Sequence, residues 1–465
     1  MIHRLPVLFF LLISNLAIAQ WDDTDRLSKA FHAGRRDALR EKMPAKSMAV
    51  FFSNPIRNRA NDVDYQYSQD PNFYYLTGYL EPNSMLLVFK EEQLLSDQKV
   101  QEVLFVQENN PRREVWTGKR LGVEGAAKLH GIRLVYSNND FKYFNFPESL
   151  EKIYADLPDQ PNKDKAEKCD LATLVQQFGE KKSSSKKVQE DSKLKEMMAQ
   201  LREIKQPEEM TLMRKAIDIT IIGFREMIKA VRPGMTEYQA QAINEYHFKK
   251  NGSEYPGYPS ICGAGNNSCV LHYIYNRKPL NDSDIFLVDM GAEYHGYTAD
   301  ITRTIPVNGR FNEQQRIIYQ LVYDAQEAGF DSCITGNPFI SVDEGAKKVI
   351  ADGLLKLGII QNVADARKYF MHGTSHYLGL DVHDAGTFTE LKPGTVLTVE
   401  PGIYIPEGSD CDKKWWKIGV RIEDDVLITT DGHEILSRSL PRTITDLEKL
   451  MQEPSYFEDL NVNQR

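Results

Sequence analysis

The stretch LVDMGAEYHGYTADITRT, residues 287–304, constrains the fold more than any other part of the chain. Apolar and β-branched residues on both sides of positions 293–296 predict two strands joined by a turn. A four-residue turn would place Asp289 directly opposite Asp300, with Cβ atoms roughly 4.5 to 5.5 Å apart. Facing carboxylates destabilise a sheet unless a cation lies between them. The hairpin therefore predicts a metal site. The alternative is a register shifted by one residue, with the two acids on different faces.

Composition limits the class of protein. A chain of 465 residues exceeds one ordinary core and predicts two domains. A hydrophobic content of 41% and a charged content of 26% are typical of a globular protein, and a net charge of -9 argues against a nucleic-acid partner. The five cysteines show no C-x-x-C spacing, which argues against a zinc ribbon, and whether Cys262 pairs with Cys269 stays open.

The N-terminus has the pattern of a secretory leader. His3 and Arg4 precede the apolar run LPVLFFLLI, and residues 17–19 form an A-x-A site. The run is shorter than the roughly 20 residues that span a bilayer. We expect residues 1–19 to be removed near Ala19, an exported mature protein, and no membrane span. The alternative is a buried N-terminal helix.

Residues 20–192 are expected to form an α/β domain. Helical patterns alternate here with short apolar runs, at 47–52, 84–89, 102–106 and 132–137. This spacing is typical of strands interleaved with helices. The charged run EKKSSSKKVQED at 180–191 has no apolar face and predicts a mobile surface segment near the domain boundary.

Residues 193–465 are expected to form an α+β domain that contains the hairpin. Pro207 is the predicted first residue of a long helix, and Thr236 opens a capping box that begins another. Strands dominate the rest of the domain, with helices predicted around 312–330 and 341–357.

Two further acids occupy positions where an apolar strand does not normally hold a charge. In GTVLTVEPGIYI, Glu400 follows an apolar strand and precedes Pro-Gly, which places it at a strand end. In KIGVRIEDDVLI, alternation with the apolar positions sends Arg421 and Glu423 to the same face. Taken alone, Glu423 is more simply explained as the polar face of a half-exposed strand.

Histidines cluster in MHGTSHYLGLDVHDAG, where His372, His376 and His383 fall within twelve residues. Such a cluster is often structural, and its spacing is not that of an H-E-x-x-H zinc protease helix. Together with the four carboxylates, however, it forms an oxygen-rich ligand set with imidazole. Two divalent ions about 3.5 to 4 Å apart use bridging carboxylates and activate a shared water. This set favours manganese-like ions over metals that prefer thiolates.

The order of DMGAEYHGYTADITRT, HGTSHYLGLDVHDAG, TVEPGIY and GVRIEDD resembles the creatinase-like "pita-bread" metallopeptidases, and within them the Xaa-Pro aminopeptidases (aminopeptidase P). The resemblance extends to YSQDPNFYYLTGYLEP at 67–82 and to REIKQPEEM. It implies a creatinase N-terminal-like α/β domain followed by a pita-bread α+β catalytic domain. It also implies a homo-oligomer, either a dimer or a tetramer.

The resemblance implies roles for individual residues. Asp289 and Asp300 would bind metal with Asp300 bridging, His376 and Glu400 would hold the second of two divalent ions, and Glu423 would be the other bridge. We expect both ions to be Mn²⁺. The residues assigned to catalysis are Glu400, His272, His383, His372 and Arg421, and those assigned to substrate binding are His272, His383 and Tyr404.

In the family, a hydroxide between the two ions attacks the scissile carbonyl, and Glu400 matches the proton acceptor. His383 matches a histidine that contacts the substrate carbonyl and helps to stabilise the tetrahedral intermediate, while His372 and Arg421 match supporting positions. The implied activity is release of the N-terminal residue from peptides with proline at position two.

Three alternatives remain within the same fold. A prolidase would use the same ligands to cut only Xaa-Pro dipeptides, although SHYLGLDVHD and the first domain favour the aminopeptidase. A methionine aminopeptidase normally lacks the large first domain. A creatinase-like peptide-binding module without peptidase activity would lose metal ligands, whereas all five ligand types are present here.

Overall fold

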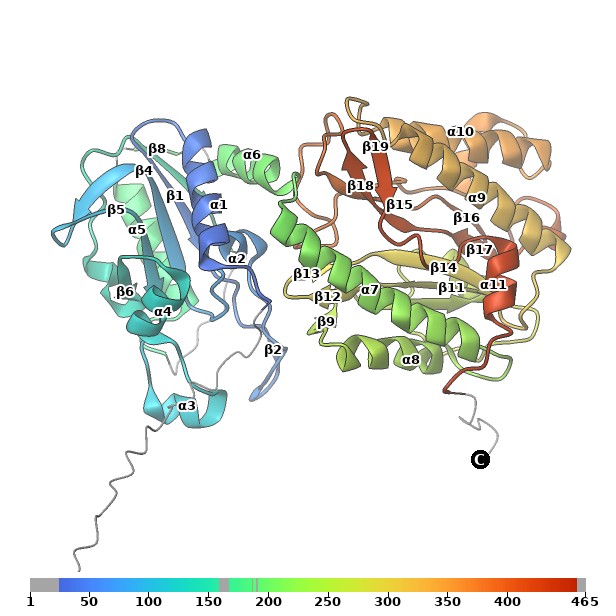
Figure 1. The fold of residues 1–465 in the computed structure, drawn as a ribbon, viewed down its shortest axis with the longest axis horizontal. Coiled ribbons are helices and arrows are strands. Elements are labelled where there is room, and N and C mark those ends of the chain that lie inside the picture. The colour runs from blue at the N-terminus through green and yellow to red at the C-terminus, as the bar shows by residue number, and fades with distance from the viewer. Residues whose placement is uncertain (1–24, 159–166, 186, 190, 458–465) are drawn as a thin grey trace, which may run out of the picture.

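The computed structural model describes residues 25–158, 167–185, 187–189 and 191–457 and has two domains that lie side by side (Figure 1). The leader predicted at residues 1–19 lies outside the described residues. Among the described residues, no helix is long and apolar enough to span a membrane. All five cysteines are free, so Cys262 and Cys269 do not form a disulfide.

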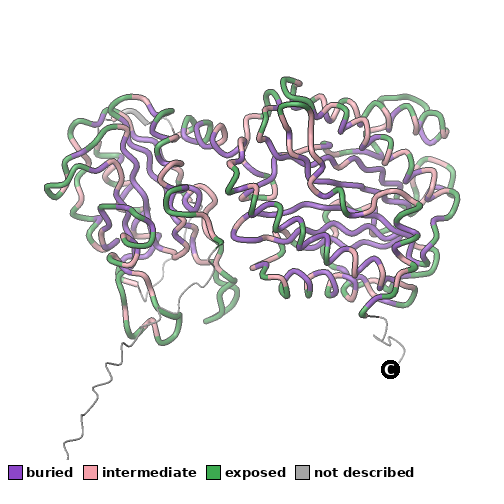
Figure 2. Tube along the Cα trace, viewed as in Figure 1, coloured by how far each residue is buried: buried purple, intermediate pink, exposed green. Residues whose placement is uncertain are grey.

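The first domain is built on a mixed sheet with the strand order β6-β5-β4-β1-β7-β8. These strands are β1 (Ser47–Phe52), β4 (Met85–Leu95), β5 (Gln98–Val106), β6 (Val135–Ser137), β7 (Lys152–Asp156) and β8 (Val188–Gln189). Side chains alternate along the central strand β1, so Phe51 enters one hydrophobic core and Val50 the other. Figure 2 shows these central strands as buried.

Helices cover both faces of this sheet, which confirms the predicted α/β fold. One face packs against α1 (Lys29–Lys42), α2 (Pro71–Thr77) and α4 (Gly122–His130), and the other against α5 (Leu171–Ser184). The remaining elements lie at the surface and are α3 (Pro111–Thr117) and the small hairpin of β2 (Asn58–Ala60) and β3 (Val63–Asp64).

The charged run at 180–191 is ordered into secondary structure where it is described, so the prediction of a mobile segment is wrong. Helix α5 continues to Ser184, and β8 pairs in parallel with β7. Lys182 is buried and its Nζ donates to Asp191 Oδ2 at 2.6 Å. Lys182 thus pairs with an acid of the same run, and Lys187 Nζ donates to the backbone carbonyls of Pro147 and Leu150, contacts that composition does not predict.

Helix α6 (Asp191–Arg202) spans the predicted boundary between residues 192 and 193 and runs from the first domain toward the second (Figure 1). Its apolar side chains join the core of the first domain; they are Leu194, Met197, Met198 and Leu201. On this packing we assign α6 to the first domain and place the change of domain between Arg202 and Pro207.

The second domain packs small antiparallel sheets against two pairs of helices. Helix α7 (Pro207–Ala230) begins at the predicted proline and packs on α8 (Glu237–Lys250), which begins at the predicted capping box. On the opposite side lie α9 (Glu313–Ser332) and α10 (Ser341–Lys356) (Figure 1), close to the predicted bounds. A last helix, α11 (Ile444–Leu450), contacts α7 and α9.

The strands of the second domain lie between these helices. They are β9 (Tyr255–Pro256), β10 (Ile261–Ala264), β11 (Ile285–Met290), β12 (Ala292–Tyr294), β13 (Tyr297–Thr298), β14 (Ile301–Pro306), β15 (Val396–Val399), β16 (Gly402–Ile405), β17 (Ile418–Arg421), β18 (Asp424–Thr429) and β19 (Gly432–Ile435). Their sheets have the orders β10-β11-β14, β13-β12-β9, β15-β18-β19 and β16-β17.

The hairpin forms, but its register differs from the prediction. Asp289 on β11 lies opposite Thr302 on β14, not opposite Asp300. The turn consists of two residues, His295 and Gly296, with φ of 51° and 88°. A two-residue turn with both φ positive matches the twist of hairpin strands, and glycine adopts it without strain. Because the register moves by two residues rather than one, Asp289 and Asp300 stay on the same face as diagonal neighbours.

Candidate functional site

The two aspartates of the hairpin converge on one hydroxyl group. Tyr258 Oη lies 2.6 Å from Oδ1 of both Asp289 and Asp300, so the two carboxylates share its single O–H. The two aspartates are 7% and 5% exposed, respectively. Asp289 is held near the end of β11, and Asp300 stands directly before β14. The predicted pairing of these two acids at one place is therefore present despite the changed register.

Glu400 and His376 join them from another part of the chain. Glu400 follows β15 directly, as predicted, and the segment at 374–376 pairs with this strand through Thr398 N to His376 O at 3.0 Å and Glu400 N to Thr374 O at 2.8 Å. His376 Nε2 consequently lies 3.2 Å from Glu400 Oε1 and 3.4 Å from Asp300 Oδ2.

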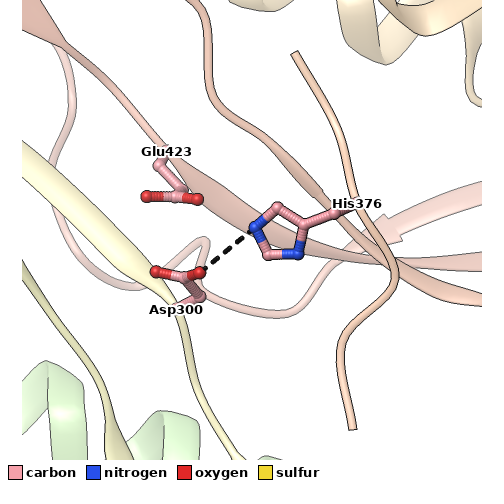
Figure 3. Close-up of side chains that lie close together, drawn as sticks. All are labelled: Asp300, His376 and Glu423. Carbon is pink, nitrogen blue, oxygen red and sulfur yellow. Dashed lines mark ion pairs between the residues drawn. The ribbon is translucent and has the colours of Figure 1, made fainter. Parts of the chain in front are cut away.

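Glu423 completes the set between β17 and β18. Its backbone N–H donates to Thr302 O at 3.1 Å, and Thr302 Oγ1 donates to Glu423 Oε2 at 2.6 Å. The side chain is 1% exposed, so Glu423 does not lie on a half-exposed strand. Figure 3 shows the Glu423 and Asp300 carboxylates facing each other beside the His376 ring, and one possible ligand atom from each lies within 4.8 Å of the others.

The carboxylates of this cluster lie close together and shift each other's pKa values. Burial and the charge of Asp289 raise the pKa of Asp300 to about 7. Burial and the neighbouring carboxylates raise the pKa of Glu423 well above its usual range. Burial would also raise the pKa of Glu400, but its hydrogen bond to His376 and the imidazolium charge lower it to about 2. Buried carboxylates this close together can all be ionised only if positive charge lies among them.

This donor set fits divalent cations. Four carboxylates offer hard oxygen ligands, one imidazole offers nitrogen, and the described residues place no thiolate among them. His376 Nδ1 lies 3.0 Å from Tyr377 O, so a neutral ring that donates Nδ1–H there would turn the Nε2 lone pair toward a bound metal ion.

A hydrogen-bonded chain leads away from Asp289. Arg421 Nη2 donates to Asp289 Oδ2, and its Nη1 donates to Tyr404 Oη at 2.9 Å. His372 Nε2 lies 2.8 Å from the same hydroxyl. Arg421 and His372 thus occupy the supporting positions expected of them. Tyr404 is fully buried and contacts the site through Arg421 and His372, and its contact with substrate stays a prediction.

His383 and His272 lie on the solvent side of the cluster, and both are exposed. The rings of His376 and His383 meet edge to face with centroids 4.4 Å apart. Burial and the positive charge of His376 lower the pKa of His383, and His272 is close enough to add to this effect. Both histidines are therefore placed where a bound molecule can reach them.

Sequence reasoning missed Tyr258 and Asp425. Tyr258 lies in YPGYPS, where nothing marks it as a partner of two acids. Asp425 Oδ2 accepts from Asp300 N at 3.2 Å, and burial raises the pKa of its carboxyl well above the usual range. The acidic run EDD signalled this position, but the prediction used only its first residue.

Comparison with known proteins identifies the family. Residues 211–430 match metallopeptidase family M24, and residues 32–153 match the aminopeptidase P N-terminal domain. A Xaa-Pro aminopeptidase of Haemophilus influenzae is 36% identical over 440 residues, which cover 92% of this chain and 98% of that protein. This chain belongs to metallopeptidase family M24, in its aminopeptidase P branch.

Solved structures of aminopeptidase P agree with this assignment. Pseudomonas aeruginosa aminopeptidase PepP has a TM-score of 0.82 and 34% identity, with 92% of this chain and 98% of that chain covered. Escherichia coli aminopeptidase P, solved with the inhibitor Pro-Leu, has a TM-score of 0.80 and 33% identity, with the same coverage. The M24 match contains all four carboxylates and His376, so the aminopeptidase P fold places them in the catalytic domain.

Replacing Asp300 is expected to reduce the stabilisation of the folded protein by Mn²⁺. Excess Mn²⁺ should stabilise the chelator-treated wild-type protein by about 2.7 kcal/mol at 100 times the dissociation constant. This corresponds to a rise in melting temperature of roughly 5 to 10 °C. Asp300→Asn should gain less than half of that rise, because one ligand charge is lost. Thermal melts with and without Mn²⁺ measure the effect.

The exposed Asp282→Asn variant is the control and should respond to Mn²⁺ like the wild type, because Asp282 contacts Asn308 at the end of β11 and β14 that does not carry Asp289 and Asp300. An equal rise in Asp300→Asn would show that Asp300 is no ligand.

Proposed function

We propose that this protein removes the N-terminal residue from peptides whose second residue is proline, by metal-dependent hydrolysis. The observation that carries this proposal is the convergence of Asp289, Asp300, His376, Glu400 and Glu423 on one partly solvent-accessible place in an aminopeptidase P fold. A peptide bond to proline is tertiary and lacks an N–H, so a dedicated enzyme is chemically reasonable.

These five side chains would hold two divalent ions, and we propose Mn²⁺ for both because the set is rich in oxygen. When bound, such a pair supplies a Lewis acid for the scissile carbonyl and lowers the pKa of a water molecule. Arg421, anchored on the buried Tyr404, fixes one oxygen of Asp289 and holds this ligand in place.

The other residues of the site bind substrate and move protons. Glu400 is 15% exposed and matches the proton acceptor of the family, so we assign it the proton released during attack. The His383 ring meets the His376 ring edge to face and can donate a hydrogen bond to the substrate carbonyl. His272 is exposed beside it and can hold the peptide near the proline.

One cavity near the site has room for a peptide. It measures about 670 Å³ and lies between the two domains, with Gly257 and Val382 in its wall. These residues adjoin Tyr258 and His383 in the chain, so the cavity begins beside the site. The cavity has room for more than a dipeptide, and the cleavage test below decides whether longer peptides are preferred.

The test uses the mature protein loaded with Mn²⁺ and compares the tripeptide Ala-Pro-Ala with the dipeptide Ala-Pro. Alanine should be released from the tripeptide at a rate at least about a hundredfold above that of Asp300→Asn. Chromatographic quantification of free alanine measures both rates. Cleavage of Ala-Pro alone would make the protein a prolidase, and cleavage of neither peptide would support a binding module.

We also propose that the protein is exported, because residues 1–19 have the form of a cleaved leader. The protein recovered from expressing cells should begin at Gln20, which N-terminal sequencing reads directly, and an intact Met1 would contradict export. The family resemblance further supports a homodimer or homotetramer, and a molar mass in solution equal to one chain would exclude both.

A further inference from the structure

A buried ion cluster lies directly behind His383. Asp384, the next residue, accepts from Arg202 Nη2 through Oδ1 and from Lys205 Nζ through Oδ2 at 2.7 Å. The side chains of Arg202, Lys205 and Asp384 are 6%, 1% and 1% exposed. Each oxygen of one carboxylate therefore has its own cation, away from solvent.

Both cations come from the connection between the domains. Arg202 is the last residue of α6, and Lys205 stands just before α7. Arg202 Nη1 also donates to Asn72 Oδ1 on α2 of the first domain at 2.8 Å. The backbone of Lys205 donates to Gly394 O at 2.8 Å, which fixes it on the second domain. The cluster thus joins the first domain, the linker and the segment that carries His383.

The segment itself is a closed loop. Asp384 N donates to Tyr377 O at 2.9 Å, so the backbone at 377–384 returns on itself between His376 and His383. A Cβ at Gly379 would lie 2.2 Å from Asp384 Oδ2 and 2.8 Å from Lys205 Nζ, so only glycine leaves room for the ion cluster. The two histidine rings meet at the open side of this loop.

Stability alone is a poor explanation for this arrangement. Desolvating two cations and a carboxylate costs several kcal/mol per ion, and packed apolar side chains would stabilise the interface at least as well. The cluster fixes the orientation of the Asp384 side chain, because Arg202 and Lys205 each hold one of its two carboxylate oxygens. His383 is bonded to that residue through a single peptide link.

We propose that Arg202, Lys205 and Asp384 are positioning residues that set His383 against the peptide substrate and make this position depend on the docked first domain. The proposal rests on the proposed peptidase function. Asn72 carries the dependence on the first domain, through its contact with Arg202.

The test is a double-mutant cycle between Lys205→Met and His383→Ala. Lys205→Met removes one cation and leaves a neutral Arg202–Asp384 pair, so the chain is expected to fold. In the wild-type background it should lower kcat for Ala-Pro-Ala about tenfold. In the His383→Ala background it should change kcat by less than about twofold, because the group through which it acts is gone.

Lys182→Met is the matched control, because Lys182 is also a buried lysine paired with an aspartate, Asp191, but lies in the first domain away from the site. It should leave kcat unchanged in both backgrounds. An equal loss of kcat from Lys205→Met in both backgrounds, or no loss in the wild type, would overturn the proposal. Should Lys205→Met fail to fold, Arg202→Lys takes its place with the same expected non-additivity.

An NMR measurement that needs no peptide cleavage tests the positioning role independently of the proposed peptidase function. In protein labelled with ¹³C at histidine Cε1, the resonance missing from His383→Ala identifies His383. That resonance should shift in Lys205→Met and stay in place in Lys182→Met. An unmoved resonance would overturn the positioning role, whatever the activity, whereas a shifted resonance in a protein that cleaves neither peptide would count against the peptidase function alone.

Discussion

Four carboxylates share one buried place in the second domain, and charges of the same sign at this spacing repel. Asp300, Glu423, Glu400 and Asp289 meet there with one imidazole and one guanidinium as their positive neighbours. Burial and the neighbouring carboxylates raise the pKa values of Asp300 and Glu423, because both disfavour the charged forms. Divalent ions offset this repulsion, so metal binding and the local fold stabilise each other.

Backbone pairings between segments that are distant in the sequence bring these side chains together. Thr302 pairs with Glu423, and the segment of His376 pairs with β15 ahead of Glu400. Each pairing brings one ligand to another through main-chain hydrogen bonds and leaves the side chains free to point inward. The ligands thus stand on or next to hydrogen-bonded backbone, which favours the fixed geometry that a metal site requires.

The sequence predicted those features that local patterns determine. The helix start at Pro207 and the strand at 47–52 follow from capping and apolar runs, and both were correct. The acids were found because charge in an apolar strand is conspicuous. The direct pairing of Asp289 with Asp300 was wrong, because the choice of a two-residue turn at His295 and Gly296 depends on backbone twist, which composition does not encode.

Other features lie beyond any local pattern. Tyr258 has no sequence signature as a partner of aspartates, and Lys205 is separated from Asp384 by 179 positions. The run at 180–191 was misjudged because its charges find partners only in the folded sheet. The roles of His272 and His383 came from family resemblance alone, since an exposed histidine by itself predicts nothing.

The central claim is that these carboxylates and His376 exist to hold two cations. Anomalous diffraction from crystals grown with Mn²⁺ tests it most directly. Two anomalous peaks enclosed by Asp289, Asp300, His376, Glu400 and Glu423 are predicted. One peak would contradict the pair of ions, and the absence of any peak among these side chains would contradict the metal site itself.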